Sequence, residues 1–314
     1  MKKIHFIFSL PLMLSLVGCG GNTSTNTASN STPAPSSSTT NELGDPNVVD
    51  VVVLAGQSNM EGHTWINKLL NNTPSSMHDY YLDGFENTEI MYHCNGGANK
   101  SEFFTPVKVG QGFDKTRFGP EVGIAEELFL RERARPVYIV KYALGATSLY
   151  NNSHWNANGN NGLFDKMVNY VWDQIYYFEQ QEIDVRIKGL FWMQGEADSC
   201  DAGGQQGTRY YDDLSNFVAK FREEFEELYG EPDKGIAFVD AGISDCSTWT
   251  HYETVNAAKK QFAESDPSKN YYFDTMEEGL QYKYDNQDYY HFDATSEIKL
   301  GKLFISKLLD NGWL

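Results

Sequence analysis

Basic residues are scarce in this sequence, and their scarcity argues against two kinds of partner. Lysine and arginine number 25 against 43 aspartates and glutamates, which gives a formal net charge of −18 at pH 7. The densest basic stretch, 131–135, contains a glutamate of its own. Phosphate backbones and anionic lipid headgroups repel such a chain. We therefore expect no nucleic acid partner, and a neutral substrate fits the composition better than an anionic one.

A long apolar run is missing as well. The apolar stretch at 4–17 is too short to cross a bilayer as a helix. It follows a basic start and leads into Leu-Val-Gly-Cys at 16–19, a pattern typical of a secretory signal peptide. This ending looks like a lipobox, in which Cys19 is acylated and becomes the new N-terminus. The alternative is an ordinary signal peptide with a chance cysteine.

The segment that follows contains few apolar residues. Residues 20–46 are mostly Ser, Thr, Asn, Pro and Gly, which cannot bury enough surface to offset the entropy of ordering the chain. We expect a signal peptide at 1–18, an acylated cysteine with a flexible tether at 19–46, and one folded domain at 47–314. Gly20 is not the aspartate associated with inner-membrane retention. The expected location is therefore that of an exported bacterial lipoprotein, anchored in an outer membrane or at the cell surface.

Cysteines are few, and none is spaced for a metal. Apart from Cys19 the sequence has Cys94, Cys200 and Cys246, without a Cys-x-x-Cys pair or a Cys/His cluster of zinc spacing. Cys200 and Cys246 each follow a predicted strand, so a disulfide between them is one possibility in an exported protein. Three unpaired thiols are the other, and the sequence does not decide between them.

Apolar runs alternate with helical patterns through the domain. Strands are predicted for the β-branched and apolar runs at 48–55, 136–142, 189–193 and 236–240, with further candidates at 89–92 and 271–273. Helices are predicted at 121–133, 164–178, 210–228, 252–264 and 296–309. Strands that are apolar on both faces and separated by helices indicate an α/β fold, a mostly parallel sheet covered on both sides. Ligands bind at the carboxyl ends of the strands in such folds.

A serine follows the first predicted strand, in Gly-Gln-Ser-Asn-Met-Glu-Gly at 56–62. On a tight turn from strand to helix, Ser58 would present its hydroxyl at the edge of the sheet. Its backbone N–H, at a helix N-terminus, would face a developing oxyanion. A serine that merely caps the helix is the plainer alternative.

An acid and a histidine lie just before the last predicted helix. Asp288 precedes His291 by three residues and can accept the Nδ1 proton of its ring, which leaves Nε2 to take a proton from a serine. Asp285 and Asp293 are competing partners. A surface histidine among acidic residues is the alternative interpretation.

Two further groups follow predicted strands. Gln194 and Glu196 lie in Trp-Met-Gln-Gly-Glu-Ala-Asp at 192–198, where an amide can donate to an oxyanion. Gly145 follows the strand at 136–142 and exposes a backbone N–H. Glycines that simply permit turns would explain the same residues.

Taken together, these motifs resemble those of the SGNH hydrolase superfamily, and more specifically its sialate O-acetylesterases and the acetylxylan esterases of carbohydrate esterase family six. The matching motifs are Gly-Gln-Ser-Asn-Met at 56–60, Phe-Gly-Pro-Glu at 118–121, the run at 192–198, and Asp-Tyr-Tyr-His at 288–291. The resemblance implies a three-layer α/β/α sandwich with a central, mostly parallel sheet, which is flavodoxin-like.

It also implies roles for individual residues. Ser58 is expected to be the nucleophile, His291 the general base and Asp288 its partner, with the N–H groups of Ser58 and Gly145 and the side chain of Gln194 as oxyanion donors. Gln194 stands where the wider superfamily has asparagine. The resemblance gives Glu121 and Glu196 supporting roles, and it implies no metal and no cofactor.

The leading functional hypothesis is therefore a serine esterase that removes O-acetyl groups from a carbohydrate, either acetylated hemicellulose such as xylan or O-acetylated sialic acid. One alternative is a general short-chain esterase or thioesterase. The other is a surface glycan-binding lipoprotein without catalysis.

Overall fold

The computed structural model describes residues 47–314, apart from 134, 229–233 and 283–287, and these residues belong to one compact unit. The signal peptide, Cys19 and the tether predicted from the sequence lie outside the described residues. None of the described helices is both long and apolar enough to span a membrane.

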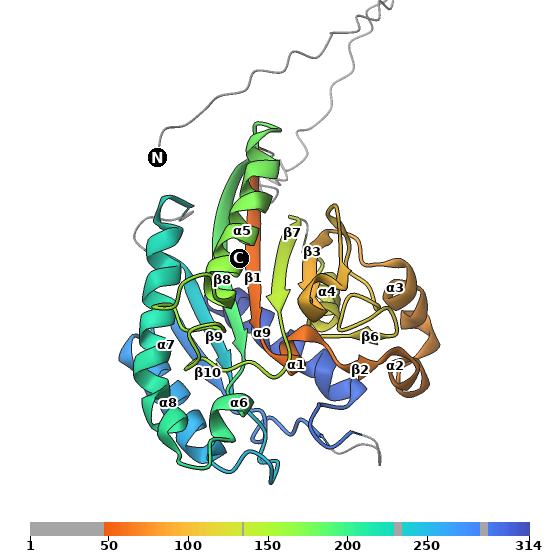
Figure 1. Ribbon diagram of the computed structural model, residues 1–314. Helices are drawn as coiled ribbons and strands as arrows, with labels where there is room; N and C mark the ends of the chain where they lie inside the picture. Colours follow the sequence, from red (N-terminus) through yellow and green to blue (C-terminus); the bar gives the residue numbers. More distant parts are fainter. Residues whose placement is uncertain (1–46, 134, 229–233, 283–287) are drawn as a thin grey trace, which may run out of the picture. The chain divides into compact units, whose positions relative to one another are not determined.

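A mostly parallel sheet forms the centre of the fold (Figure 1). Its strand order is β10-β9-β8-β1-β7-β3-β4, and only β4 and β5, which both pair with β3, run antiparallel to their neighbour among these described strands. Strands β2 and β6 pair separately. The strands are β1 (Val48–Gly56), β2 (Thr64–Trp65), β3 (Thr88–Cys94), β4 (Asn99–Lys100), β5 (Thr105–Pro106), β6 (Arg117–Phe118), β7 (Val137–Ala143), β8 (Asp184–Met193), β9 (Ala237–Ala241) and β10 (Asn270–Phe273).

Helices cover both faces of the sheet. They are α1 (Ser58–Glu61), α2 (Ile66–Asn72), α3 (His78–Asp83), α4 (Glu121–Leu130), α5 (Leu163–Glu179), α6 (Glu196–Ser199), α7 (Gln205–Glu224), α8 (Tyr252–Ser265) and α9 (Ala294–Asp310), with short 3₁₀ helices at Ser75–Met77, Asn95–Gly97 and Glu226–Leu228. Trp192 of β8 packs against Phe217 of α7, whereas its neighbour Phe191 stacks on Phe304 of α9. The predicted α/β sandwich with a mostly parallel sheet is confirmed.

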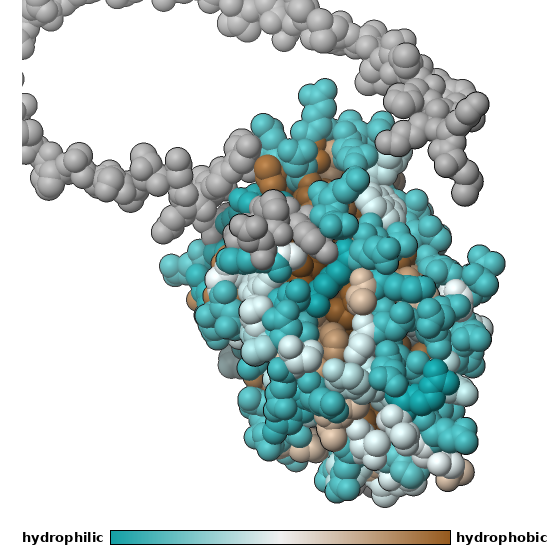
Figure 2. All heavy atoms as spheres, turned by 90° about the vertical axis from the view of Figure 1, so that its left-hand side faces the viewer, coloured by the Kyte–Doolittle hydropathy of each residue, from teal (hydrophilic) through white to brown (hydrophobic). Residues whose placement is uncertain are grey.

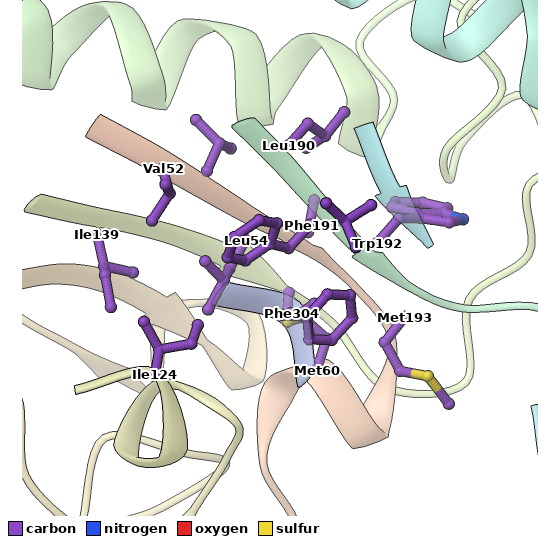
Figure 3. Close-up of a cluster of buried hydrophobic side chains, with 14 of the residues drawn as sticks. Val52, Leu54, Met60, Ile124, Ile139, Leu190, Phe191, Trp192, Met193 and Phe304 are labelled. Carbon is purple, nitrogen blue, oxygen red and sulfur yellow. The ribbon is translucent and has the colours of Figure 1, made fainter. Parts of the chain in front are cut away.

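Successive side chains of the central strands enter opposite layers of the core. Leu190 and Trp192 lie on the α5 side in Figure 3, and Val52, Leu54 and Phe191 point away from it. All five side chains are buried. This two-sided burial explains why β1 and the second half of β8 read as continuous apolar runs.

The predicted elements are present, and two of them begin five residues earlier than predicted. Strand β8 begins at Asp184 rather than 189, because the alternating residues 184–188 pair with the first half of β1. Helix α7 begins at Gln205 rather than 210, because the carboxylate of Asp201 accepts the N–H groups of Gln205 and Gln206 and caps a polar first turn.

The topology also fixes where a ligand can bind. From β1 the chain fills one side of the sheet with β3 and β7 and then the other side with β8, β9 and β10. A reversal of this kind opens a crevice at the carboxyl end of the strand where it occurs. That end of β1 is Gly56, two residues before Ser58.

The surface is mostly hydrophilic on the face shown in Figure 2. Hydrophobic residues appear between the hydrophilic ones in small patches. Such a surface suits a protein that works in water.

Candidate active site

A cavity of about 650 Å³ lies at the carboxyl end of β1. Ser58 and His291, far apart in the sequence, both line it. Its other lining residues are Gln57, Glu61, His63, Asn95, Phe113, Leu144, Gly145, Ala146, Ala197, Cys200, Trp249 and Tyr290. The predicted nucleophile and the predicted base therefore face one space.

The turn before Ser58 depends on a glycine. Gly56 has φ +149°, and a Cβ at this position would lie 2.1 Å from the carbonyl oxygen of Met193. The next N–H, of Gln57, donates to that same oxygen at 3.0 Å. This close approach holds the ends of β1 and β8 together and begins α1 at Ser58. As the first residue of α1, Ser58 has no acceptor for its N–H within the helix.

His291 is held by Asp288, as predicted. The ring Nδ1 lies 2.8 Å from Asp288 Oδ2, and Asp288 Oδ1 accepts the backbone N–H groups of Tyr290 and His291. Burial would raise the pKa of Asp288, but the hydrogen bond and charge of His291 and these two N–H groups lower it to about 2. The ionised carboxylate keeps the proton of His291 on Nδ1, so Nε2 is left as an acceptor.

Asp285 and Asp293 were the competing partners predicted for His291. Asp293 caps α9 by accepting the N–H of Ser296, so its carboxylate serves the helix. Asp285 lies outside the described residues.

No hydrogen bond joins Ser58 Oγ to a partner in the described part of the chain, so this hydroxyl is free to turn toward the base.

Asn59 and Glu196 hold the histidine loop in place. The Asn59 side chain donates to Glu196 Oε1 at 3.0 Å and accepts the N–H of Phe292 at 3.2 Å. Burial raises the pKa of Glu196, and the hydrogen bond from Asn59 opposes this effect. Glu196 thus acts through Asn59 on the segment that carries His291, in agreement with a supporting role.

The structure gives Gly145 a different partner from the one predicted. Its N–H donates to Glu61 Oε2 at 3.1 Å, so this predicted oxyanion donor is already bonded. The residue does line the cavity beside the nucleophile, because a Cβ on Gly145 would lie 3.6 Å from Ser58 Cβ. Gly145 therefore lies next to Ser58, but its N–H, the predicted oxyanion donor, is bonded to Glu61.

Gln194 also departs from its predicted role. Its side chain is fully buried and does not line the cavity, and its Nε2 lies within hydrogen-bond distance of Gln57 Oε1, Thr147 O and Asp198 Oδ2. The amide is therefore engaged within the protein. Its place behind Gln57 indicates that it orients a neighbour and does not touch an oxyanion.

Gln57 is a functional candidate that the sequence interpretation missed. Its Oε1 accepts from Gln194 Nε2 and from the N–H of Ala197, both at 3.2 Å, which fixes the orientation of the amide. Among the described residues, Gln57 Nε2 has no acceptor, although the side chain is 97% buried and lines the cavity. A fixed amide donor thus faces the space next to Ser58.

Glu61 and His63 form a second acid–imidazole pair, which was also missed. Glu61 Oε2 lies 2.8 Å from His63 Nε2, and Oε1 accepts the N–H of Asn95. The ring of His63 stacks on that of His291, with 4.5 Å between the ring centres. Glu61 lies inside the serine motif, and this position could have marked it as a functional residue. Its contacts with distant loops were not visible in the sequence.

The remaining predicted residues are structural. Glu121 accepts the N–H of Gly119 and lies 2.6 Å from Lys141 Nζ in a fully buried ion pair, away from the cavity. Cys94, Cys200 and Cys246 are free thiols, so the disulfide alternative for Cys200 and Cys246 is not realised. No group of metal-binding side chains occurs among the residues that the structure describes.

Comparison with known proteins places the chain in a family. The family model described as "Carbohydrate esterase, sialic acid-specific acetylesterase" matches residues 48–310. Comparison with the curated proteins finds no match.

Several solved structures share the fold. A protein from Arabidopsis thaliana is 18% identical, with 85% of this chain and 99% of that chain covered and a TM-score of 0.60. NanS is 12% identical over 84% of this chain and 98% of its own, with a TM-score of 0.57. A carbohydrate acetylesterase from Xanthomonas citri is 13% identical over 82% of this chain and 55% of its own, with a TM-score of 0.53. The chain therefore belongs to the sialic acid-specific acetylesterase family of carbohydrate esterases, and it is a carboxylic ester hydrolase.

Proposed function

We propose that the protein removes O-acetyl groups from carbohydrates by a Ser58–His291–Asp288 acyl-enzyme mechanism. The observation that carries this proposal is that His291, bonded through Nδ1 to Asp288, lines one cavity with the free hydroxyl of Ser58. A serine with an oriented imidazole beside it is the arrangement that acyl transfer needs.

In the first step His291 Nε2 takes the Ser58 proton, and Ser58 Oγ attacks the acetyl carbon. The N–H of Ser58 and Nε2 of Gln57 hold the resulting oxyanion. The intermediate then expels the sugar oxygen, which receives the proton from His291. In the second step His291 deprotonates a water that attacks the acetyl-serine, and acetate leaves as Ser58 regains its proton. Asp288 stabilises the imidazolium in both steps.

The charges around the cavity favour a neutral sugar. None of the described lining residues is lysine or arginine, and Glu61 contributes a carboxylate. Sialic acid carries a carboxylate of its own, which this cavity does not balance. Trp249 and Tyr290, 5.5 Å apart between ring centres, form an aromatic wall on which a sugar ring can stack. We therefore favour acetylated hemicellulose, such as xylan, over O-acetylated sialic acid.

The test is acetate release by the purified protein from acetylated xylan, O-acetylated sialic acid and 4-nitrophenyl acetate, with Ser58→Ala as control. We expect release from xylan, reduced at least about 10³-fold in the variant. Activity on the nitrophenyl ester alone would indicate a general esterase instead. Inactivity on every ester would indicate a glycan-binding protein without catalysis.

We also propose a lipid anchor on Cys19, on the strength of the Leu-Val-Gly-Cys pattern at 16–19. Acylation there would leave the enzyme at a membrane surface, at the end of a tether long enough to reach a polymeric substrate. Labelling of producing bacteria with a palmitate analogue tests this. The label should appear in the wild type and be missing in Cys19→Ser, and equal labelling of both proteins would refute the anchor.

A further inference from the structure

His63 lines the cavity, and the acyl transfer described above gives it no role. Its ring stacks on that of His291, with 4.5 Å between the ring centres, and lies tilted against that of Phe113, with 4.6 Å between the ring centres. The side chain is 14% exposed, and it lines the same cavity as Ser58. A sugar bound in this cavity for attack by Ser58 can therefore contact His63 as well.

The neighbours of Glu61 decide which nitrogen of His63 carries the proton. The Gly145 N–H donates to Oε2 of Glu61, and the Asn95 N–H donates to Oε1. Since both carboxylate oxygens accept hydrogen bonds, His63 Nε2, which lies 2.8 Å from Oε2, must be the donor of its pair. A neutral His63 then has its lone pair on Nδ1.

The surroundings of His63 favour its neutral form. Burial lowers its pKa, the hydrogen bond and the charge of Glu61 oppose this, and the nearby charges of His291 and Arg117 lower it. Within the described part of the chain, Nδ1 has no hydrogen-bond partner. An acceptor without a partner thus belongs to a ring that lines the cavity beside the base.

We propose that His63 Nδ1 accepts a hydrogen bond from a free hydroxyl on the sugar carbon next to the acetylated one, so that Glu61 and His63 make the enzyme specific for partly acetylated sugars. Acetylated sugars carry such hydroxyls, whereas simple alkyl and aryl acetates do not. A site with an acceptor in this position discriminates against substrates that leave the acceptor unpaired. The inference rests on the proposed carbohydrate esterase function and identifies the substrate feature that the site recognises.

The experiment compares two substrates and needs no variant for its first result. Both are 4-nitrophenyl xylosides with one acetyl ester; one has a free hydroxyl on the neighbouring carbon, and the other has a methyl ether there. We expect the full-length wild type to prefer the free hydroxyl by about tenfold in kcat/KM. Equal kcat/KM for the two substrates would overturn the proposal.

Variants then assign the preference to His63. His63→Phe keeps a ring between Phe113 and His291 but removes the acceptor, so the preference should fall to about twofold or less. Phe113→Leu removes the other stacking ring and keeps the acceptor, so the preference should persist whatever happens to the rates. Rates are normalised to the Ser58 sites titrated with a phosphonate. A preference that survives in His63→Phe would assign it to another residue and overturn the proposal.

The outcome also separates this inference from the function on which it rests. Acetate release from the xylosides without a hydroxyl preference would refute the role of His63 and leave the carbohydrate esterase standing. Hydrolysis of 4-nitrophenyl acetate without release from either xyloside would refute both.

Discussion

At the scale of single residues, the site depends on which polar atoms already have partners. Gly145 N–H and Gln194 Nε2 are engaged within the protein, whereas Gln57 Nε2 is fixed in orientation and has no acceptor in the described part of the chain. A preorganised donor contributes most where it needs no rearrangement as charge develops. We therefore propose Gln57, next to Ser58, as the side-chain donor to the oxyanion.

The Gln57→Glu substitution tests that role. The glutamate keeps an oxygen for Ala197 N–H and Gln194 Nε2, but a second oxygen replaces the donor that faces the cavity. We expect kcat for an acetylated sugar to fall about 10²–10³-fold. Gln181→Glu, which adds the same charge on an exposed side chain, is the control and should leave kcat unchanged. A Gln57→Glu enzyme with nearly normal kcat would contradict the assignment.

The pKa of Asp288 makes its contribution to stability dependent on pH. Because the pKa falls from 3.8 to about 2 on folding, the carboxylate stabilises the fold by roughly 2 kcal/mol above pH 4, and this is lost as the pH falls through 2. Urea unfolding between pH 2 and 7 measures this contribution. Above pH 4 the free energy of unfolding of the wild type should exceed that of Asp288→Asn by about that amount, and the difference should shrink as the pH falls. A difference that is constant over this range would mean that the pKa of Asp288 is not lowered.

The sequence was most informative where motifs are local. Ser58 after a strand and Asp288 three residues before His291 were predicted from spacing. The structure brings Ser58 and His291 to one cavity, with Asp288 bonded to His291. The partners of Gly145 and Gln194 could not be predicted, because they come from loops and helices distant in the chain. Only the folded backbone shows which of these donors remain free.

At the scale of elements, the junction of β1 and α1 depends on the contact of Gly56 with β8. The predicted strands and helices were found because their apolar periodicity is strong, and the missed elements, such as β2, β6, α2 and α3, are two to seven residues long. Segments this short carry too few residues for a periodic pattern. They are nevertheless the elements that place loops around the cavity.

Gly56→Ala should therefore destabilise the domain strongly. The new Cβ would lie 2.1 Å from Met193 O, so the ends of β1 and β8 must move apart. We expect a loss of more than about 3 kcal/mol in the free energy of unfolding. Gly279→Ala is the matched control, since Gly279 has φ +76° with no atom within 4 Å of a Cβ; it should cost only about 1–2 kcal/mol. Similar losses in both variants would show that backbone strain, and not the contact with Met193, makes Gly56 necessary.

At the scale of the whole domain, the two ends of the sheet have different roles. The cavity lies at the carboxyl end of β1, while Asp50 near the other end is buried and forms ion pairs with Arg133, Arg135 and Arg186 at 2.8–3.4 Å. Gly56 lies six residues after Asp50 along β1. At a rise of about 3.3 Å per residue, the two are roughly 20 Å apart. Charges at that distance are screened from the chemistry by solvent and salt.

Asp50→Asn should consequently change stability without changing catalysis. The variant leaves three partly buried guanidinium groups without their shared carboxylate, which we expect to cost about 2–3 kcal/mol, less than for a fully buried pair. Asp184→Asn, at an exposed position on the same end of the sheet, should stay within about 0.5 kcal/mol of wild type. Per folded molecule, kcat/KM should match wild type in both variants. A loss of kcat/KM in Asp50→Asn, at a temperature where the variant is fully folded, would mean that the Asp50 end of the sheet is coupled to the catalytic end. The division of the sheet into a stabilising and a catalytic end would then be wrong.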